Sequence, residues 1–389
     1  MKRVSIVIIT SRFPFPLEKG DKLRIYHQIK DLSNYYDLFL ISINTETKVN
    51  HRQINELKKY CRKVFIIKLS VIDRIINIIK AWINKEPLQI GYFYSKKAHK
   101  KVKYIIDEIQ PNWIYSQLIR TSKYTQAYEN NIIDYMDTFS KGIERRIHTF
   151  PRIIQPFIRR EFYITQKYET DIFSHFKHHT IITENDRNFI KHTNNHKINI
   201  VPNGVDTHYF KEKAKQNKKF DLVFVGNMNY PPNIEAAIYL CEEILPIIQK
   251  KQTCTVLIGG TNPNKRVKKL ASNNITISGW VEDIRDVYST GRLFVAPMFI
   301  GTGLQNKLLE AMSMGIPCIT TQLANRALLA NESEIIIKND AQGFADACIN
   351  LLKNKKKYQE ISIKGRSFVQ KKYDWRNMNQ KLRQIFNSK

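Results

Sequence analysis

The chain has 389 residues, 42% of them apolar and 25% charged, so its composition is that of a globular protein and not of a disordered one. At roughly 100–200 residues per domain, this length predicts two domains. The formal net charge of +28 favours anionic partners, namely nucleic acid, acidic lipid or phosphorylated substrates, although solvent faces filled with lysine are an alternative explanation.

The N-terminus and the cysteines indicate a cytoplasmic protein. The apolar run Val4–Ile9 is too short to span a bilayer, and no small-residue cleavage site follows it, so we expect a buried first strand and not a signal peptide. The five cysteines are scattered and form no CxxC pair, which argues for a reducing compartment and against a disulfide or zinc framework.

The first half of the chain alternates strand and helix patterns. The run Val4–Thr10 is rich in β-branched residues, a Pro- and Gly-containing loop follows, and Lys22–Tyr35 has helical spacing. Further strands are predicted at Tyr36–Ile43, Val64–Leu69, Trp113–Ser116, Asn131–Asp134 and Thr180–Thr183. Such alternation predicts a doubly wound parallel sheet, and hence an α/β fold.

The pattern restarts after a turn at Pro202–Asp206 and a lysine-rich linker at Lys211–Lys219. Strands are predicted at Phe220–Gly226, Thr255–Gly259, Ile275–Ser278, Leu293–Ala296 and Pro317–Thr321, and helices at Ile234–Lys250, Lys265–Ala271, Leu304–Met314, Asp340–Lys353 and Lys357–Lys372. We therefore expect two Rossmann-like domains, residues 1–205 and 206–372. A C-terminal helix within residues 373–389 would cross back to the first domain.

The loop that follows the strand Leu293–Ala296 has features of an anion site. Gly301 and Gly303 let the backbone approach a ligand closely, and the helix that begins near Leu304 offers unpaired N–H groups. Lys307 can neutralise a phosphate, and Glu310 lies three residues later on the same helix face, where a carboxylate could accept ribose hydroxyls. The alternative is a plain turn followed by a surface Lys–Glu pair.

Two other loops should reach the same edge of the second sheet. Gly226 and Asn227 end one strand, and a Pro-Asn pair then begins a helix, which leaves room for a phosphate or sugar. After the strand Ile275–Ser278, Trp280 and Val281 could offer backbone groups to a base, although Trp280 could instead belong to the core.

These loops resemble those of retaining glycosyltransferases of the GT-B fold in glycosyltransferase family 4, and within it bacterial exopolysaccharide sugar transferases. The resemblance rests on TSRFPFPLEKGDKLRIYHQIKDLS near the N-terminus, DYMDTFS at Asp134–Ser140, VPNGVD, FVGNMNYPPN, SGWVEDIR and GTGLQNKLLEAMSMGIPCITT. It covers nearly the whole chain.

The resemblance implies that a nucleotide-sugar, such as a UDP- or GDP-sugar, binds mainly to the second domain. Glu310 would hold the ribose, Lys307 would neutralise the diphosphate, and Gly20 would lie near the transferred group. The other implied donor-binding residues are Gly226, Asn227, Trp280, Val281, Gly301, Thr302, Gly303 and Leu304.

The chain departs from the family pattern at three points. One is that a histidine that often contacts the donor sugar from the first domain has no clear counterpart here. Thr302 stands where the family usually carries a glutamate that contacts the donor sugar. The loop FVGNMNYPPN lacks the Arg and Lys that usually bind the diphosphate in the family. Lys307 would therefore have to neutralise more of the diphosphate charge, with Arg326 as a candidate second cation. No DxD pair stands where it could bind Mg²⁺, so we expect no cofactor and metal-independent transfer. The resemblance to retaining enzymes implies transfer with retention. Asp137 is the candidate to orient the acceptor, unless it caps a helix.

The basic first half suggests where the acceptor lies. Residues 51–103 hold 14 Lys or Arg and 3 Asp or Glu, and within them Val71–Ile83 has an apolar face. This segment is either a core helix or a helix in an anionic membrane interface. Peripheral membrane contact would suit a glycan or a polyprenyl-diphosphate-linked acceptor.

Two other functions remain open at this point. A nucleotide-sugar 2-epimerase shares the two-domain fold and would convert the donor without an acceptor. A nucleic-acid-binding protein would suit the charge, but the chain shows no aromatic stacking surface and no recognised binding module. The sequence therefore favours a glycosyltransferase without a nucleic-acid partner.

Overall fold

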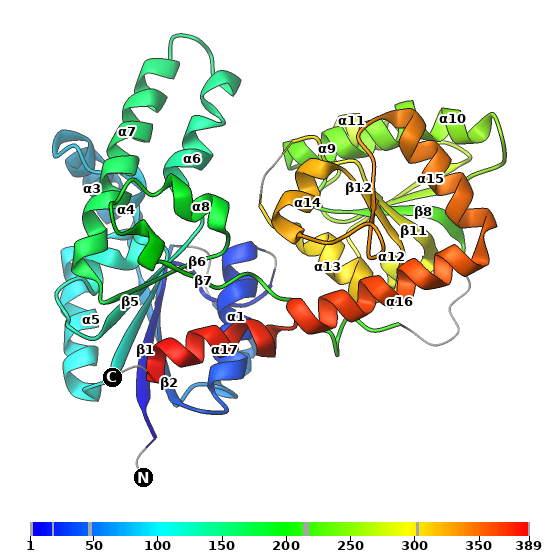
Figure 1. Ribbon diagram of the computed structural model, residues 1–389. Coiled ribbons are helices and arrows are strands. Elements are labelled where there is room, and N and C mark those ends of the chain that lie inside the picture. Colours follow the sequence, from blue (N-terminus) through cyan, green and yellow to red (C-terminus); the bar gives the residue numbers. More distant parts are fainter. Residues whose placement is uncertain (1–2, 18, 46–48, 213–217, 301–302, 388–389) are drawn as a thin grey trace. The chain divides into compact units, whose positions relative to one another are not determined.

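The computed structural model describes residues 3–17, 19–45, 49–212, 218–300 and 303–387. The chain forms two compact units (Figure 1). Unit 1 consists of Met1–Pro202 together with Asn379–Lys389, and unit 2 consists of Asn203–Met378. Each unit is a parallel sheet with helices on its faces, which confirms the predicted α/β class with two Rossmann-like domains.

Unit 1 contains a parallel sheet in the order β3-β2-β1-β4-β5-β6-β7. Its strands are β1 Ser5–Thr10, β2 Asp37–Asn44, β3 Lys63–Lys68, β4 Trp113–Gln117, β5 Asn131–Met136, β6 His178–Ile181 and β7 Asn199–Ile200. Its helices are α1 Gly20–Leu32, α2 His51–Lys58, α3 Val71–Ile83, α4 Leu88–Phe93, α5 Lys96–Ile109, α6 Phe139–Glu144, α7 Gln155–Asp171 and α8 Glu184–Phe189. The strand order reverses between β1 and β4, where the loops after these two strands diverge.

The core of unit 1 explains why its central strands read as unbroken apolar runs. Ile6 and Ile8 of β1 pack on one side of the sheet, and Val7 and Ile9 pack on the other. Both faces are covered, so no polar alternation remains. A fully buried ion pair, Arg24 to Asp134, joins α1 to β5 with 2.7 Å between Nε and Oδ2.

Helix α17, Trp375–Asn387, begins in unit 2 and ends in unit 1. Its residues Leu382, Ile385 and Phe386 are buried in unit 1. The Phe386 ring lies 5.6 Å from that of Tyr36, measured between ring centres. The last residues of the chain therefore complete the core that the first strands begin.

Unit 2 contains a parallel sheet in the order β10-β9-β8-β11-β12-β13. Its strands are β8 Phe220–Val225, β9 Val256–Gly259, β10 Ile275–Gly279, β11 Gly291–Ala296, β12 Cys318–Thr320 and β13 Ile336–Ile337. Its helices before α17 are α9 Pro231–Ile238, α10 Leu245–Gln249, α11 Lys265–Lys268, α12 Ile284–Thr290, α13 Asn306–Ser313, α14 Gln322–Leu328, α15 Ala341–Lys353 and α16 Lys355–Lys372. The order reverses between β8 and β11.

One predicted helix of unit 2 has an irregular centre. The segment expected at Ile234–Lys250 begins at Pro231 and contains a π-helical turn, Tyr239–Ile244, before α10. Pro246 lies just after that turn. Because proline has no N–H, it cannot make the usual helical bond four residues back, and the wider turn relieves the clash with the preceding carbonyl.

The VPNGVD segment ties the start of unit 2 to the start of α17. The amide of Val205 donates to the carbonyl of Tyr373 over 2.7 Å, and the amide of Trp375 donates to the carbonyl of Val205. A Cβ atom on Gly204 would lie 2.8 Å from the Trp375 ring and from the Tyr373 carbonyl. This glycine therefore serves a close backbone approach.

The five cysteines are buried and free. None of the helices in the described part of the chain is both long and apolar enough to cross a bilayer.

Candidate functional site

The candidate residues of unit 2 follow strands on both sides of its reversal point. Gly226 follows β8, and the loop before α13 follows β11, and these two strands pair directly. Loops that follow neighbouring strands on opposite sides of a reversal leave a crevice at the carboxyl edge of the sheet.

Glycines line this edge over three strands. The amide of Gly226 donates to the carbonyl of Gly259, and the amide of Gly260 donates to the carbonyl of Gly279. Gly260 has a φ of +122°, and a Cβ atom on it would lie 1.9 Å from the carbonyl oxygen of Gly226. The loops after β8, β9 and β10 thus approach one another so closely that side chains are excluded.

Lys307 on α13 is held by Asn233, in the first turn of α9, the helix that follows the loop after β8. Its Nζ donates a hydrogen bond to Oδ1 of Asn233, lies 5.0 Å from the ring centre of Phe224 and lies 4.0 Å from the Met298 sulfur. Asn233 in turn donates from Nδ2 to the carbonyl of Asn227 over 2.9 Å. Desolvation lowers the pKa of Lys307 to about 8, and Glu310 opposes that change. An anionic ligand would stabilise the charged form of an ammonium in this position.

Glu310 lies one turn further along α13, and a buried tyrosine fixes it. The hydroxyl of Tyr288 donates to Oε2 of Glu310 over 2.7 Å. The other oxygen, Oε1, has no hydrogen-bond partner among the described residues. Desolvation raises the pKa of Glu310, while Tyr288 and Lys307 oppose the rise. The carboxylate therefore keeps one oriented oxygen available to accept hydroxyl groups.

The start of α13 bears on the predicted anion site. No side chain caps its first turn at Gln305, and Oδ1 of Asn306 is buried without a partner in the described part of the chain. Gly303 is exposed, with no atom within 4 Å of an added Cβ, and Leu304 packs against the core. Gly301 and Thr302 lie outside the described residues.

The remaining candidates of unit 2 are Trp280, Val281 and Arg326. Trp280 follows β10 and is 68% exposed, so it is not the core residue that one interpretation allowed. Val281 beside it is partly buried against the core. Arg326, the suggested helper for the diphosphate, is exposed on α14.

Gly20, the first residue of α1, lies close to the end of β5, which Asp137 follows. A Cβ atom on Gly20 would lie 3.5 Å from the Cε of Met136, the residue before Asp137. Asp137 does not cap α6, since the N-cap residue there is Thr138. Part of its side chain reaches solvent, yet the surrounding protein raises the pKa of Asp137 to about 6 through desolvation, with Asp186 adding to the rise and Arg120 opposing it.

Two groups around Asp137 were not among the predicted residues. Glu169 on α7 accepts hydrogen bonds from the hydroxyl of Ser140, at 2.5 Å, and from the amide of Phe139, at 2.6 Å, and desolvation raises the pKa of Glu169 to about 8. The guanidinium carbon of Arg120 lies 4.9 Å from the ring centres of both Phe93 and Phe139. Glu169 lies 29 residues after Ser140, so no local motif joins them. Their contacts arise only from the fold.

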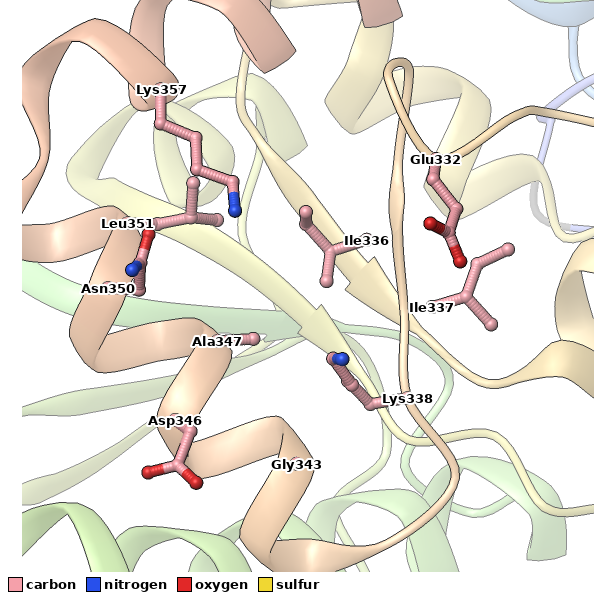
Figure 2. A pocket seen from close by; sticks show the side chains of 10 residues that line it. All are labelled: Glu332, Ile336, Ile337, Lys338, Gly343, Asp346, Ala347, Asn350, Leu351 and Lys357. Atoms are coloured by element: carbon pink, nitrogen blue, oxygen red, sulfur yellow. The ribbon is translucent and has the colours of Figure 1, made fainter.

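A separate cavity lies at the edge strand of unit 2, away from these residues. It has a volume of about 410 Å³, and its walls come from β13, α15 and α16 (Figure 2). Asp346, on its α15 wall, is already paired with Lys251 over 2.9 Å. None of the predicted site residues lines this cavity. In the described residues, no three His, Cys, Asp or Glu side chains converge as metal ligands would.

Comparison with protein families matches residues 219–354 to a family described as "Glycosyl transferases group 1". The matched range lies within unit 2 and includes Gly226, Asn233, Lys307 and Glu310. Unit 2 is therefore similar to a glycosyltransferase domain over the part that carries the candidate site.

Two curated relatives and a solved structure extend the comparison. An "Uncharacterized 44.6 kDa protein in cps region" of Klebsiella pneumoniae is 24% identical, over 95% of this chain and 96% of its own length. An Escherichia coli "UDP-Gal:alpha-D-GlcNAc-diphosphoundecaprenol alpha-1,3-galactosyltransferase" is 28% identical, over 41% of this chain and 46% of its own length. The crystal structure of Anabaena Alr3699/HepE in complex with UDP and glucose superposes with a TM-score of 0.68 at 11% identity and covers 99% of this chain and 100% of that one. This last likeness bears on the fold alone.

Proposed function

We propose that the protein is a glycosyltransferase that moves a sugar from a nucleotide-sugar to a glycan or lipid-linked acceptor in bacterial polysaccharide biosynthesis. The observation that carries this proposal is the pair of Lys307 and Glu310 on α13, each held by a neighbouring side chain, at the reversal point of the unit 2 sheet. The family match over this part of the chain and the names of the two curated relatives support it.

The chemistry of the pair suits a nucleoside diphosphate. Lys307 loses hydration without gaining an ion pair among the described residues, so a phosphate would compensate its charge. Glu310 Oε1 can accept a ribose hydroxyl while Tyr288 holds Oε2. We propose that Gly301, Thr302 and Gly303 surround the diphosphate and the sugar, and an added Cβ on Gly303 would meet no atom within 4 Å. We propose UDP as the nucleotide, because the Escherichia coli relative is named for UDP-Gal.

The reaction would depend on stabilising the departing diphosphate. The glycosyl–phosphate bond breaks with negative charge developing on the phosphate oxygen, and preorganised positive groups lower the barrier most when they face that charge. Lys307 and the uncapped first turn of α13 supply such groups. We propose that transfer needs no metal and retains the anomeric configuration. The acceptor hydroxyl would attack from the face that the phosphate leaves, and its proton would pass to the departing phosphate oxygen.

The acceptor would bind in unit 1 beside Asp137. With a pKa of about 6, this carboxyl is mostly ionised at neutral pH and can accept a hydrogen bond from an acceptor hydroxyl. A diphosphoundecaprenol-linked acceptor, as in the name of the Escherichia coli relative, lies at a membrane. We therefore also propose a cytoplasmic protein with a peripheral location at the inner face of the cytoplasmic membrane.

A thermal-shift screen of the full chain against UDP, GDP and their sugar conjugates tests the donor site. A ligand that binds only the folded protein raises the melting temperature by mass action. One nucleotide class should stabilise the wild type, and Lys307→Ala or Glu310→Ala should remove the effect. Lys364→Ala and Glu360→Ala, which break an exposed pair on α16, are the matched controls and should respond like the wild type.

Two results would contradict the proposal. Stabilisation that persists in both α13 variants would place the donor elsewhere. Product analysis of the donor incubated without any acceptor is the second test. An epimerised donor sugar would indicate an epimerase and not a transferase.

A further inference from the structure

Helix α3 packs against unit 1 with its polar side and turns its apolar side outward. Its only buried residue is Ala81. Arg74 donates to the hydroxyl of Tyr92 over 2.6 Å, and Asn77 donates to the carbonyl of Tyr94 over 2.8 Å. A Cβ atom on Gly91 of α4 would lie 2.5 Å from the Asn77 carbonyl, so the two helices are in close contact through small and polar groups. A core helix would bury its apolar side, so the core interpretation of Val71–Ile83 is wrong.

The outward side of α3 is strongly exposed. Ile72 is 71% exposed, Ile83 is 70% exposed, and Ile75 and Ile79 are each 54% exposed. Val71, Ile76 and Trp82 complete the same side. Single exposed apolar residues are ordinary, but a continuous row along one helix indicates a surface that another body covers.

The start of α7 extends this surface from a distant part of the chain. The rings of Trp82 and Phe157 lie 6.0 Å apart between centres, and Arg160 lies 3.8 Å above the Trp82 ring. Ile153 is 82% exposed and Phe157 is 55% exposed. We call this surface the α3–α7 face; it consists of the seven α3 residues above with Phe150, Ile153, Ile154 and Phe157. Figure 1 shows α6 and α7 projecting from unit 1 as a helical pair.

Exposed basic residues, most of them arginines, precede and begin α7 and end α3, the two segments that form the α3–α7 face. Residues 145–160 contain five of the twenty arginines of the chain and no acidic residue, unlike the lysine-rich background elsewhere. Arg145, Arg146, Arg152 and Arg159 are exposed there, and Lys80 and Lys85 are exposed at the end of α3. An apolar centre with a basic margin matches an anionic phospholipid surface, whose headgroups attract cations and whose acyl region accepts isoleucine and tryptophan.

We propose that the α3–α7 face lies in the headgroup region of an anionic phospholipid bilayer, with α3 parallel to the membrane plane. At 13 residues, α3 is about 20 Å long, too short to span the roughly 30 Å hydrocarbon core. A second copy of the chain fits less well, because a symmetric contact through this face would bring the two arginine clusters together. This proposal names the membrane partner that the proposed function requires, and it is tested without donor or acceptor.

Vesicle flotation of the full chain tests the proposal. The protein should float with phosphatidylcholine vesicles that contain about 30% phosphatidylglycerol, bind pure phosphatidylcholine at least tenfold more weakly, and dissociate as salt screens the charges. The emission of Trp82 should shift to shorter wavelength on binding, and Trp82→Phe should remove that shift. Equal binding to both vesicles, or no binding to either, would overturn the proposal.

Two pairs of variants locate the contact. Ile75→Glu with Ile79→Glu should weaken vesicle binding at least tenfold, whereas Ile363→Glu, at a position 68% exposed on α16, should not. Arg152→Glu with Arg159→Glu should weaken binding similarly, whereas Lys355→Glu with Lys356→Glu makes the same change in net charge and should bind normally. All replaced side chains are exposed, so melting temperatures should stay close to the wild type.

The outcomes separate this proposal from the proposed function. If the α3–α7 variants float like the wild type, or if sedimentation shows a dimer that Ile75→Glu dissociates, the membrane assignment is wrong. Donor stabilisation in the thermal-shift screen would be unaffected by either result. If no nucleotide stabilises the wild type but the protein still floats with anionic vesicles, the donor site is rejected and the membrane surface is supported.

Discussion

At the scale of single residues, Lys307 combines a lowered pKa with an incomplete set of partners. Its ammonium touches an amide oxygen, an aromatic ring and a thioether sulfur, all of them uncharged. Desolvation therefore destabilises the charged form of Lys307 and lowers its pKa to about 8, a pH at which binding can be measured. The charge needed to bind a diphosphate is present at neutral pH and is lost as the pH rises.

Nucleotide affinity should therefore fall at alkaline pH. Below about pH 8 the Lys307 side chain is mostly protonated and charged. Above that pH, each further pH unit lowers the charged fraction in the free protein by up to tenfold. We expect the affinity for UDP to fall by about tenfold between pH 7 and pH 9, as measured by calorimetric titration.

Lys307→Arg provides the control, because an arginine stays charged throughout this range. Its profile reports any ionisation of the ligand itself. A wild-type profile that parallels that of Lys307→Arg would mean that Lys307 does not titrate in the site.

Asn233 is expected to position Lys307 without touching the transferred sugar. Asn233→Ala removes the acceptor of the Lys307 bond and the donor to the Asn227 carbonyl. A hydrogen bond to a charged group is worth about 1.5–3 kcal/mol, so we expect UDP affinity to fall by about tenfold or more, with the pH at which affinity falls also shifted.

Asn229→Ala is the matched control, since Asn229 lies exposed on the loop just before α9. If both variants bind UDP equally, the Asn233–Lys307 contact has no role in donor binding. Circular dichroism and melting temperature check that each variant is folded.

At the scale of elements, the loops after β8, β9 and β10 are shaped by contacts that the sequence does not reveal. The reversal of strand order and the position of α13 follow from the alternating pattern and from the loop motifs. Asn233 was not predicted as a site residue because it reads as the start of a helix, and its partner Lys307 lies 74 residues away. Gly260 was not predicted either, since only the fold brings it against Gly226.

Helix α7 shows a second reason why sequence patterns fail. It is 17 residues long, yet its buried residues are Thr165 and Glu169. Without an apolar stripe at helical spacing, periodicity gives no signal for such a helix. Phe157 near its start, like the apolar residues just before the helix, belongs to the exposed α3–α7 face and therefore does not mark a core side.

Gly260→Ala should destabilise unit 2 severely. The replacement combines a φ of +122°, which L-residues rarely adopt, with a clash of 1.9 Å against the Gly226 backbone. We expect a loss of at least about 3 kcal/mol in the free energy of unfolding, measured by urea denaturation.

Gly303→Ala serves as the comparison, because an added Cβ there meets no atom within 4 Å. It should unfold within about 0.5 kcal/mol of the wild type. Similar losses for the two variants would show that the sheet edge is looser than the close contacts imply.

At the scale of the whole molecule, unit 1 depends on the end of the chain. Leu382, Ile385 and Phe386 pack against the core that β1, β2 and β4 build. The hydroxyl of Tyr36 donates to Oδ1 of Asn387 over 3.0 Å, and Arg383 pairs with Asp31. Unit 2 lies between these two parts of unit 1 in the sequence.

A chain that stops after Met378 should therefore lose stability in unit 1. Three buried apolar side chains, at about 1.5–3 kcal/mol each, predict a loss of about 5 kcal/mol or more, seen as a lower urea midpoint in the emission of Trp113. Stabilisation by UDP should persist, because the residues proposed to hold the nucleotide, Lys307 and Glu310, belong to unit 2. An unchanged urea midpoint would mean that residues 379–389 do not stabilise unit 1. Loss of stabilisation by UDP without a change in midpoint would mean that they contribute to nucleotide binding.

The arrangement of α17 also has a consequence for synthesis on the ribosome. Tyr36, Trp113 and Tyr115 emerge early, but the helix that covers them is translated only after residues 203–378. At about 5–20 residues per second, translation leaves these aromatic side chains uncovered for on the order of fifteen to fifty seconds. During that interval the nascent chain presents a site where chaperones can bind, and slower codons in unit 2 would prolong it.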